Sequence, residues 1–133
     1  MQWESVMAVS VVRWVFLIAG FYDLLIGGAF LMAGPRIFEA AGVPAPNHWA
    51  YIQFGSLLLI IFGLMFFSVA HNPGANRNLI PYGMLLKVSY AGLVAFYWAT
   101  EGCPMLFIPF AFIDAAMLAL FLLAYGIAPL SAR

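Results

Sequence analysis

The sequence predicts an all-α membrane protein, a bundle of four transmembrane helices in a single domain that covers residues 1–133. Of the 133 residues, 66% are hydrophobic and only 8% are charged, and the mean hydropathy is +1.04. Soluble domains are about half apolar and about a quarter charged, so this composition indicates an integral membrane protein. The formal net charge of zero offers no electrostatic attraction to nucleic acid and excludes it as a partner.

Four apolar stretches each approach the length of about 20 residues that a helix needs to cross a bilayer. They cover residues 11–33, 49–70, 79–100 and 106–127. Proline- and glycine-rich clusters, which end helices and form turns, lie between them. Pro81 and Pro109 fall in the first turns of the third and fourth stretches, where the missing N–H is harmless. The first stretch exceeds the apolar region of a signal peptide, about 7–15 residues, so we expect it to be retained.

The first loop, residues 35–48, is the longest. Residues 36–41 can form a short helix at the membrane interface, and Gly42 is the residue type that ends such a helix. An even number of spans places both termini on one side, which carries Arg13, Arg77 and Arg133, whereas Arg36 stands alone opposite. The excess of basic residues predicts that both termini are cytoplasmic.

Three ionisable residues, Asp23, Lys87 and Asp114, lie inside three different apolar stretches. A charge at that depth costs about 3 kcal/mol on insertion scales, so it normally faces other protein or a water-filled cavity. With a rise of 1.5 Å per residue, the depths of Asp23 and Lys87 differ by about 6 Å. A lysine side chain spans that distance, and we therefore expect a Lys87–Asp23 ion pair. A Lys87–Asp114 contact requires more helix tilt or a bridging water.

Small residues flank the three charges at helical spacing, which is how membrane helices approach each other closely. The sequence therefore predicts that all three charges lie on packing faces rather than towards lipid. The small residues in question are Ala19, Gly20 and Gly27 near Asp23, Ala91, Ala95 and Ala99 after Lys87, and Ala111, Ala115 and Ala119 around Asp114.

Two acids and one base leave one excess negative charge in a dry core. Either one aspartate is protonated or water reaches it. The functional interpretation is a polar pocket that holds a ligand or relays protons, and the structural interpretation is a charge cluster that fixes helix packing. Polar residues available to complete the cluster are Gln53, Tyr90, Ser56, Ser89 and Tyr22.

No complete catalytic signature accompanies these charges, so the sequence does not favour an enzyme. His48 and His71 bracket the second stretch and would lie about 34 Å apart on one helix, which prevents them from sharing a metal or a haem. The single cysteine, Cys103, permits no intramolecular disulfide and no paired redox motif. No catalytic residue, metal or cofactor is predicted, although a quinone or a lipid between the helices remains open as a ligand.

Short motifs in a fixed order run through nearly the whole chain. They are Phe21-Tyr22-Asp23, Gly42-Val43-Pro44, Gln53-Phe54-Gly55, the Asn72-Pro73…Asn76-Arg77 loop, Gly83 with Lys87, and Asp114 with Phe121. In these motifs the chain resembles the DoxX-like family of small bacterial membrane proteins. The resemblance implies a four-helix bundle in the bacterial inner membrane, and it includes the three charged positions.

The family takes its name from a subunit of a thiosulfate:quinone oxidoreductase, and distant relatives resemble eukaryotic membrane chaperones and proteins that handle cargo or sterols. The sequence has no cysteine or haem chemistry to support the oxidoreductase activity, so we do not transfer that activity to this chain.

Three classes of function follow from these observations. The first is a non-catalytic accessory subunit that packs against other membrane-protein subunits or a second copy of itself, which the small-residue faces and short loops favour. The second is a protein that binds quinone or another lipid, with the charged cluster at its polar end and a role in electron transfer or lipid handling. The third is a proton-coupled small transporter, although the small multidrug transporters use Glu and have no counterpart of Lys87.

Overall fold

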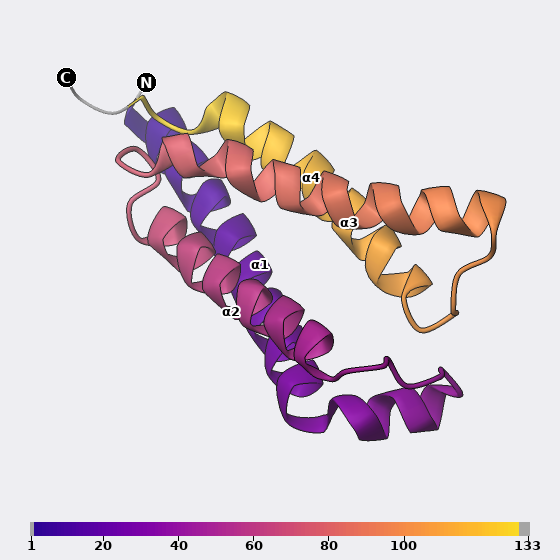
Figure 1. Ribbon diagram of the computed structural model, residues 1–133. Coiled ribbons are helices and arrows are strands. Elements are labelled where there is room, and N and C mark those ends of the chain that lie inside the picture. The colour runs from indigo at the N-terminus through magenta and orange to yellow at the C-terminus, as the bar shows by residue number, and fades with distance from the viewer. Residues whose placement is uncertain (1, 131–133) are drawn as a thin grey trace.

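The computed structural model describes residues 2–130, and within this range the chain forms four long helices and one short 3-10 helix (Figure 1). The elements are α1 (Gln2–Ala41), α2 (Ala50–His71), η1 (Arg77–Leu79), α3 (Ile80–Thr100) and α4 (Ile108–Ile127). Each of the four long helices is long and apolar enough to cross a membrane. The predicted all-α bundle of four apolar helices is therefore confirmed.

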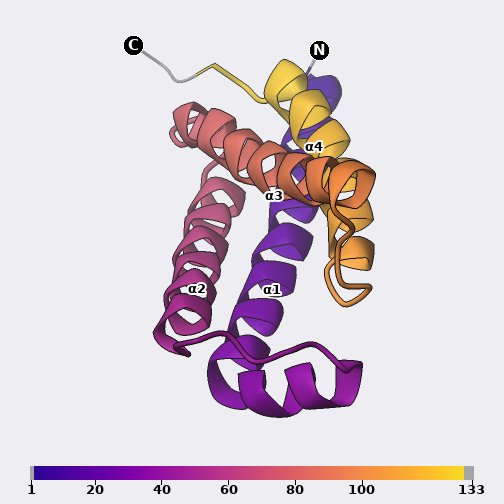
Figure 2. The ribbon, with the colours of Figure 1, turned by 45° about the vertical axis from the view of Figure 1, so that its right-hand side comes forward.

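Helix α1 contains two segments that meet at a kink. Ala33 has non-helical backbone angles, φ −134° and ψ 21°, two residues before Pro35. The proline has no N–H to donate to the carbonyl of Leu31, and its ring disfavours a straight helix. The chain turns aside after this point, so the first predicted span ends where the sequence placed its end, and residues 36–41 form a separate helical segment (Figures 1 and 2).

The kinked segment ends in a Schellman motif at Gly42. Gly42 has a φ of +69°, and its N–H donates to Glu39 O at 3.1 Å while Val43 N–H donates to Phe38 O at 2.9 Å. Glycine adopts this left-handed conformation without a steric penalty from a Cβ atom. The predicted end of the segment at Gly42 is confirmed.

The other helix boundaries differ from the predicted spans by a few residues, with one larger difference. Helix α1 begins at Gln2, nine residues before the apolar stretch, because a helix satisfies its own backbone and can continue past the end of a hydrophobic run. Pro81 and Pro109 lie in the first turns of α3 and α4, as predicted.

The four helices pack as two antiparallel hairpins, α1 with α2 and α3 with α4, and α1 also contacts α4. The hairpins meet at the end of the molecule where α1 begins and α4 ends, beside the α2–α3 connection (Figure 1). Helix α3 is inclined relative to α2 and diverges from it towards the opposite end (Figures 1 and 2). Contacts between α2 and α3 are correspondingly few.

Two glycines allow α1 and α2 to pack closely. A Cβ atom on Gly63 would lie 2.9 Å from the backbone oxygen of Gly20, and one on Gly20 would lie 3.0 Å from the oxygen of Gly63. The backbones of the two helices are therefore close at this point, and the Phe67 ring also packs against Gly20, 2.6 Å from an added Cβ. Gly20 and Gly27 therefore belong to the α1–α2 interface, as small residues on a packing face should.

The main apolar core lies between the two hairpins at the end where they meet. Its centre is a cluster of three fully buried rings, Phe16 of α1, Phe66 of α2 and Phe121 of α4. The ring centroids are 4.6 Å apart for Phe16–Phe121, 5.1 Å for Phe66–Phe121 and 5.7 Å for Phe16–Phe66. We call these residues the phenylalanine cluster. Gly83 of α3 leaves the space for the Phe66 ring, which would lie 2.6 Å from an added Cβ.

Two arginines connect helix ends at the same end of the molecule. Arg13 Nε donates to the carbonyl of Ala70 in the last turn of α2, and Arg77 Nη2 donates to Tyr125 O in the last turn of α4 at 2.8 Å. The last carbonyls of a helix have no intrahelical donor and carry partial negative charge, so a guanidinium is favourable there. Arg133, the third basic residue in the orientation argument, lies outside the described residues.

The alanine stripes predicted on α3 and α4 are wrong in detail. Ala91 is half-buried and Ala111 is buried, but Ala95, Ala99, Ala115 and Ala119 are exposed. A step of four residues overshoots one helical turn by about 40°, so a strict four-residue stripe rotates away from the interface within a few steps. The buried faces instead follow alternating steps of three and four residues, as in Ile80, Gly83, Lys87, Tyr90 and Val94 of α3.

Candidate functional site: a buried charge triad

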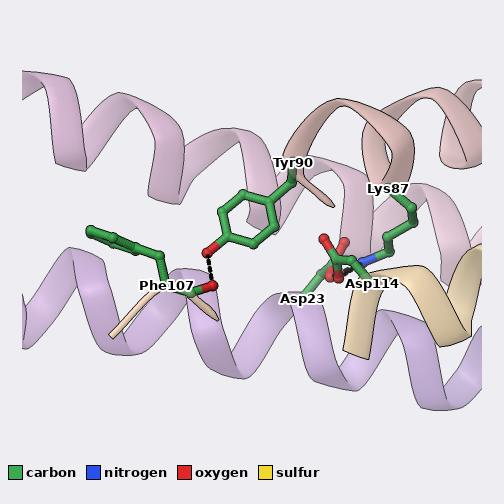
Figure 3. Close-up of polar contacts among 5 residues, drawn as sticks. All are labelled: Asp23, Lys87, Tyr90, Phe107 and Asp114. Carbon is green, nitrogen blue, oxygen red and sulfur yellow. Dashed lines mark hydrogen bonds and ion pairs between the residues drawn. The ribbon is translucent and has the colours of Figure 1, made fainter. Parts of the chain in front are cut away.

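Asp23, Lys87 and Asp114 meet at one point in the bundle, from α1, α3 and α4 respectively (Figure 3). The ammonium group of Lys87 donates hydrogen bonds to Asp23 Oδ1 at 2.8 Å and to Asp114 Oδ1 at 3.1 Å. Both contacts are ion pairs as well. We call these three residues the charge triad. One lysine thus connects three helices through two carboxylates.

The local sequence places each member of the triad on the buried face of its helix. Asp23 continues the row of Val12, Phe16 and Ala19 in α1, with steps of four and three residues. Lys87 follows Gly83 in α3, and Asp114 precedes Met117 and Phe121 in α4, with the same kind of spacing. This spacing keeps side chains on one stripe of an α-helix.

The triad is almost completely shielded from the exterior. The exposed fraction is 1% for Asp23, 0% for Lys87 and 6% for Asp114. The Lys87 ammonium also lies 5.2 Å from the ring centroid of Tyr22 and 5.7 Å from that of Phe66. Aromatic faces attract a cation, most strongly where it is desolvated. The triad therefore lies next to the phenylalanine cluster, because Phe66 of that cluster also contacts the Lys87 ammonium group.

The two carboxylates are not equivalent. Asp23 Oδ2 is buried and accepts no hydrogen bond from any residue in the range 2–130. The side chain of Asp114 has an exposed fraction of 9%, against 1% for that of Asp23. A buried acceptor without a donor is costly, because it has lost its hydrogen bonds to water and forms none within the protein. The site thus contains one unsatisfied oxygen, on its more deeply enclosed acid.

Tyr90 lies beside the triad but directs its hydroxyl away from it (Figure 3). That hydroxyl donates to the backbone oxygen of Phe107 at 2.9 Å. Tyr90 packs with Phe107 against a small second core of Val94, Ile108 and Ala111. In this arrangement its hydroxyl links α3 to the segment before α4 and forms no hydrogen bond with either carboxylate.

The remaining polar candidates do not join the triad. Gln53 is exposed near the start of α2. Ser56 is buried, but its hydroxyl donates to Ile52 O within α2, and exposed Ser89 donates in the same way to Leu85 O. A serine in a membrane helix satisfies itself by such a bond to the preceding turn. Only Tyr22 of this group contacts Lys87, and it does so through its ring.

Sequence reasoning missed one participant and left the route to one contact open. It did not identify Phe66, because a phenylalanine in an apolar helix carries no signal that distinguishes the neighbour of a cation from a lipid-facing residue. For the Lys87–Asp114 contact the sequence left helix tilt and a bridging water open, and the direct bond between the two side chains corresponds to the first alternative. The inclination of α3 is a property of the packed helices and is not contained in a count of residues from the membrane surface.

Within residues 2–130 no group of three or more His, Cys, Asp or Glu side chains is arranged to hold a metal ion. The triad itself has an ammonium group at its centre, so its carboxylates are already engaged with a cation. Its chemistry is that of charge pairing and hydrogen bonding.

Comparison with protein-family models, curated proteins and solved structures finds no match to this chain. The helices and their composition make it a small multi-pass membrane protein with four spans in contact with lipid.

Proposed function

We propose that the chain is a non-catalytic accessory or structural subunit of a larger membrane complex, and that the charge triad holds its two hairpins in one fixed arrangement. The observation that carries this proposal is the bond pattern of Lys87, which joins α1, α3 and α4 with at most 6% exposure of any triad member. A cluster enclosed in this way supports a structural role for its charges. The apolar outer faces of the helices then contact lipid and partner subunits.

The outer surface supports this proposal. Large apolar side chains are exposed on every long helix, for example Trp14 on α1, Phe54 on α2 and Phe96 on α3. An apolar groove of about 260 Å³ lies between α1 and α4, with Trp14 and Leu120 in its lining. Small exposed residues such as Ala95 and Ala115 would let a partner helix approach closely.

The proposal includes the bacterial inner membrane, which the resemblance to the DoxX-like family implies. It also includes a cytoplasmic location of both termini. Arg13 and Arg77 lie at the end of the molecule where α1 begins and α4 ends, and basic residues concentrate on the cytoplasmic side of membrane proteins. Reporter fusions or cysteine labelling at Ser10 and at Gly102, which lie at opposite ends of the bundle, test this orientation.

Purification under mild conditions tests the accessory role. The tagged chain, expressed at its natural level, is extracted in mild detergent after crosslinking from a photoreactive residue at position 96. We expect a stoichiometric complex with membrane-protein subunits or with a second copy of the chain. A lone, monodisperse protein without crosslinks would contradict the proposal.

A matched pair of variants sharpens this experiment. Lys87→Met removes the central cation of the triad, and we expect it to abolish the complex along with the arrangement of the hairpins. Arg36→Gln removes an exposed cation from the kinked segment of α1, and it should leave the complex intact.

One observation favours a second candidate function, the binding of a lipid or quinone-type ligand. Asp23 Oδ2 lacks a donor, and a ligand hydroxyl, such as that of a reduced quinone or a lipid headgroup, would supply one. Extraction of the purified protein followed by mass spectrometry of the organic phase tests this candidate. A single bound species that is retained by the wild type and lost in Asp23→Asn supports it, and an extract identical to the surrounding bulk lipid contradicts it.

A further inference from the structure

The charges of the triad do not balance. Two carboxylates face one ammonium group, and among residues 2–130 the other titratable groups next to them are the phenols of Tyr22 on α1 and Tyr90 on α3. Helix α2 contributes the ring of Phe66, while its own titratable residues, Tyr51 and His71, lie at its two ends. With both acids ionised, the triad has a net charge of −1 in an enclosed site. An uncompensated charge in such a site is strongly unfavourable, and groups placed there become neutral instead.

The unsatisfied oxygen of Asp23 identifies where a hydrogen-bond donor is missing from the triad. Asp23 Oδ1 has its donor in Lys87, but Oδ2 has none among the described residues, and the whole residue is 99% buried, with an exposed fraction of 1%. The second acid, Asp114, meets the same nitrogen atom through its own Oδ1. The two carboxyl groups are therefore neighbours in the triad (Figure 3).

We propose that the triad is a proton-binding site that holds one proton between Asp114 and Asp23. The proton resides on the second oxygen of Asp114, and the resulting O–H donates to Asp23 Oδ2. Asp23 then stays a carboxylate that accepts from Lys87 and from Asp114, and the triad as a whole is neutral. A pair of acids in one enclosed site shares a proton in this way because two like charges at close range cannot both persist.

We expect the proton to enter and leave through Asp114, the less enclosed of the two acids. This acid retains a side-chain exposure of 9%, whereas those of Asp23 and Lys87 are each 1%. The site is a property of the triad and does not rest on the accessory role. It competes with the lipid-binding candidate, because both assign a donor to Asp23 Oδ2.

The composition of the chain makes the test direct, because Asp23 and Asp114 are its only aspartates. The protein is labelled with ¹³C at the aspartate Cγ, reconstituted into phospholipid bilayers at pH 7, and measured by magic-angle-spinning NMR, where acids and carboxylates have different Cγ shifts. We expect one carboxylic acid and one carboxylate per chain, or a single averaged environment with the shift of a half-protonated pair. Two carboxylates would overturn the proposal, and so would two acids.

The same NMR measurement on the variant Asp114→Asn provides a second test of the proposal. The variant's amide N–H can donate to Asp23 Oδ2 in place of the acid, and its amide oxygen can accept from Lys87, so the variant reproduces the protonated state with little change in shape. The remaining Asp23 signal should be that of a carboxylate, so the number of protonated aspartates falls from one to zero. A protonated Asp23 in this variant would overturn the assignment. Glu39→Gln, at an exposed position, is the matched control and should leave both aspartate signals unchanged.

Discussion

The phenylalanine cluster and the charge triad are adjacent layers of the same bundle, and they stabilise it in different ways. Each layer links α1 to α4, and Phe66 of the phenylalanine cluster also contacts Lys87 of the triad. The three rings pack at centroid distances of 4.6 to 5.7 Å, but in a bilayer their alternative surroundings, lipid chains, are also apolar. The triad has no acceptable alternative in lipid, since each charge would then be unpaired.

This difference indicates a division of roles between the two layers. Apolar packing supplies close contact, yet many arrangements of four apolar helices supply similar contact. The triad requires Asp23, Lys87 and Asp114 within hydrogen-bond reach of one another and on facing sides of three helices, so it selects one arrangement. We therefore expect substitutions in the triad to disrupt the fold more than substitutions in the phenylalanine cluster, the reverse of the usual ranking in a soluble core.

The largest effect should come from Lys87→Met. The variant leaves two buried carboxyl groups without their shared cation, and removal of one partner from a buried ion pair costs about 3–5 kcal/mol. We expect little monodisperse protein and a strongly lowered melting temperature in detergent. If Lys87→Met and the exposed control Arg36→Gln give equal yield and equal thermal stability, the triad does not hold the hairpins together.

A smaller effect is expected from Phe121→Ala, which removes the ring that contacts both Phe16 and Phe66. In a soluble core such a change costs about 3–5 kcal/mol. Here we expect about 2 kcal/mol, because lipid replaces water as the alternative environment and only the packing contribution is lost. Thermal unfolding of the variant and of Phe112→Ala, at a residue that is 63% exposed, measures the difference. A loss larger than that of Lys87→Met would reverse the proposed ranking of the two layers.

Gly63→Ala tests the close contact between the backbones of the first hairpin. The new Cβ atom would lie 2.9 Å from Gly20 O, and we expect a cost of about 1–2 kcal/mol from the forced separation of α1 and α2. Gly55→Ala on the same helix has open space around its added Cβ and should be neutral or stabilising by up to about 1 kcal/mol. Equal melting temperatures for the two variants would show that the helices do not approach this closely.

The smallest effect should come from Arg77→Gln. Its guanidinium donates to Tyr125 O and lies 3.8 Å from the Tyr125 ring centroid, and the loss of both contacts costs about 1 kcal/mol. We expect faster amide hydrogen exchange at the end of α4 with little change around Lys87. Increased exchange around Lys87 instead would mean that the Arg77 contact and the triad are not independent.

Much of the fold follows from the sequence because it depends on local chemistry. Hydropathy locates the four helices, Pro35 accounts for the kink in α1, and the positive φ of Gly42 explains where the kinked segment ends. The Lys87–Asp23 contact also follows from simple counting, since a rise of 1.5 Å per residue fixes the depth of each residue in a helix.

The rest depends on how the helices cross, which local patterns do not encode. The inclination of α3 brings Lys87 directly to Asp114, and the same packing directs Tyr90 to Phe107 O and leaves Gln53 outside the cluster. The exposed Ala95 and Ala99 illustrate the limit of a spacing rule, because their four-residue interval rotates them off the interface that Lys87 occupies.

The central claim is that one lysine bridges two aspartates inside the bundle, and one measurement tests it directly. Lys87 is the only lysine of the chain, and Asp23 and Asp114 are its only aspartates, so labelling lysine Nζ with ¹⁵N and aspartate Cγ with ¹³C marks the triad alone. Dipolar recoupling in bilayers should then show the single Nζ close to two Cγ atoms, consistent with N–O distances of 2.8 and 3.1 Å. A lysine nitrogen coupled to one Cγ or to neither would contradict the account.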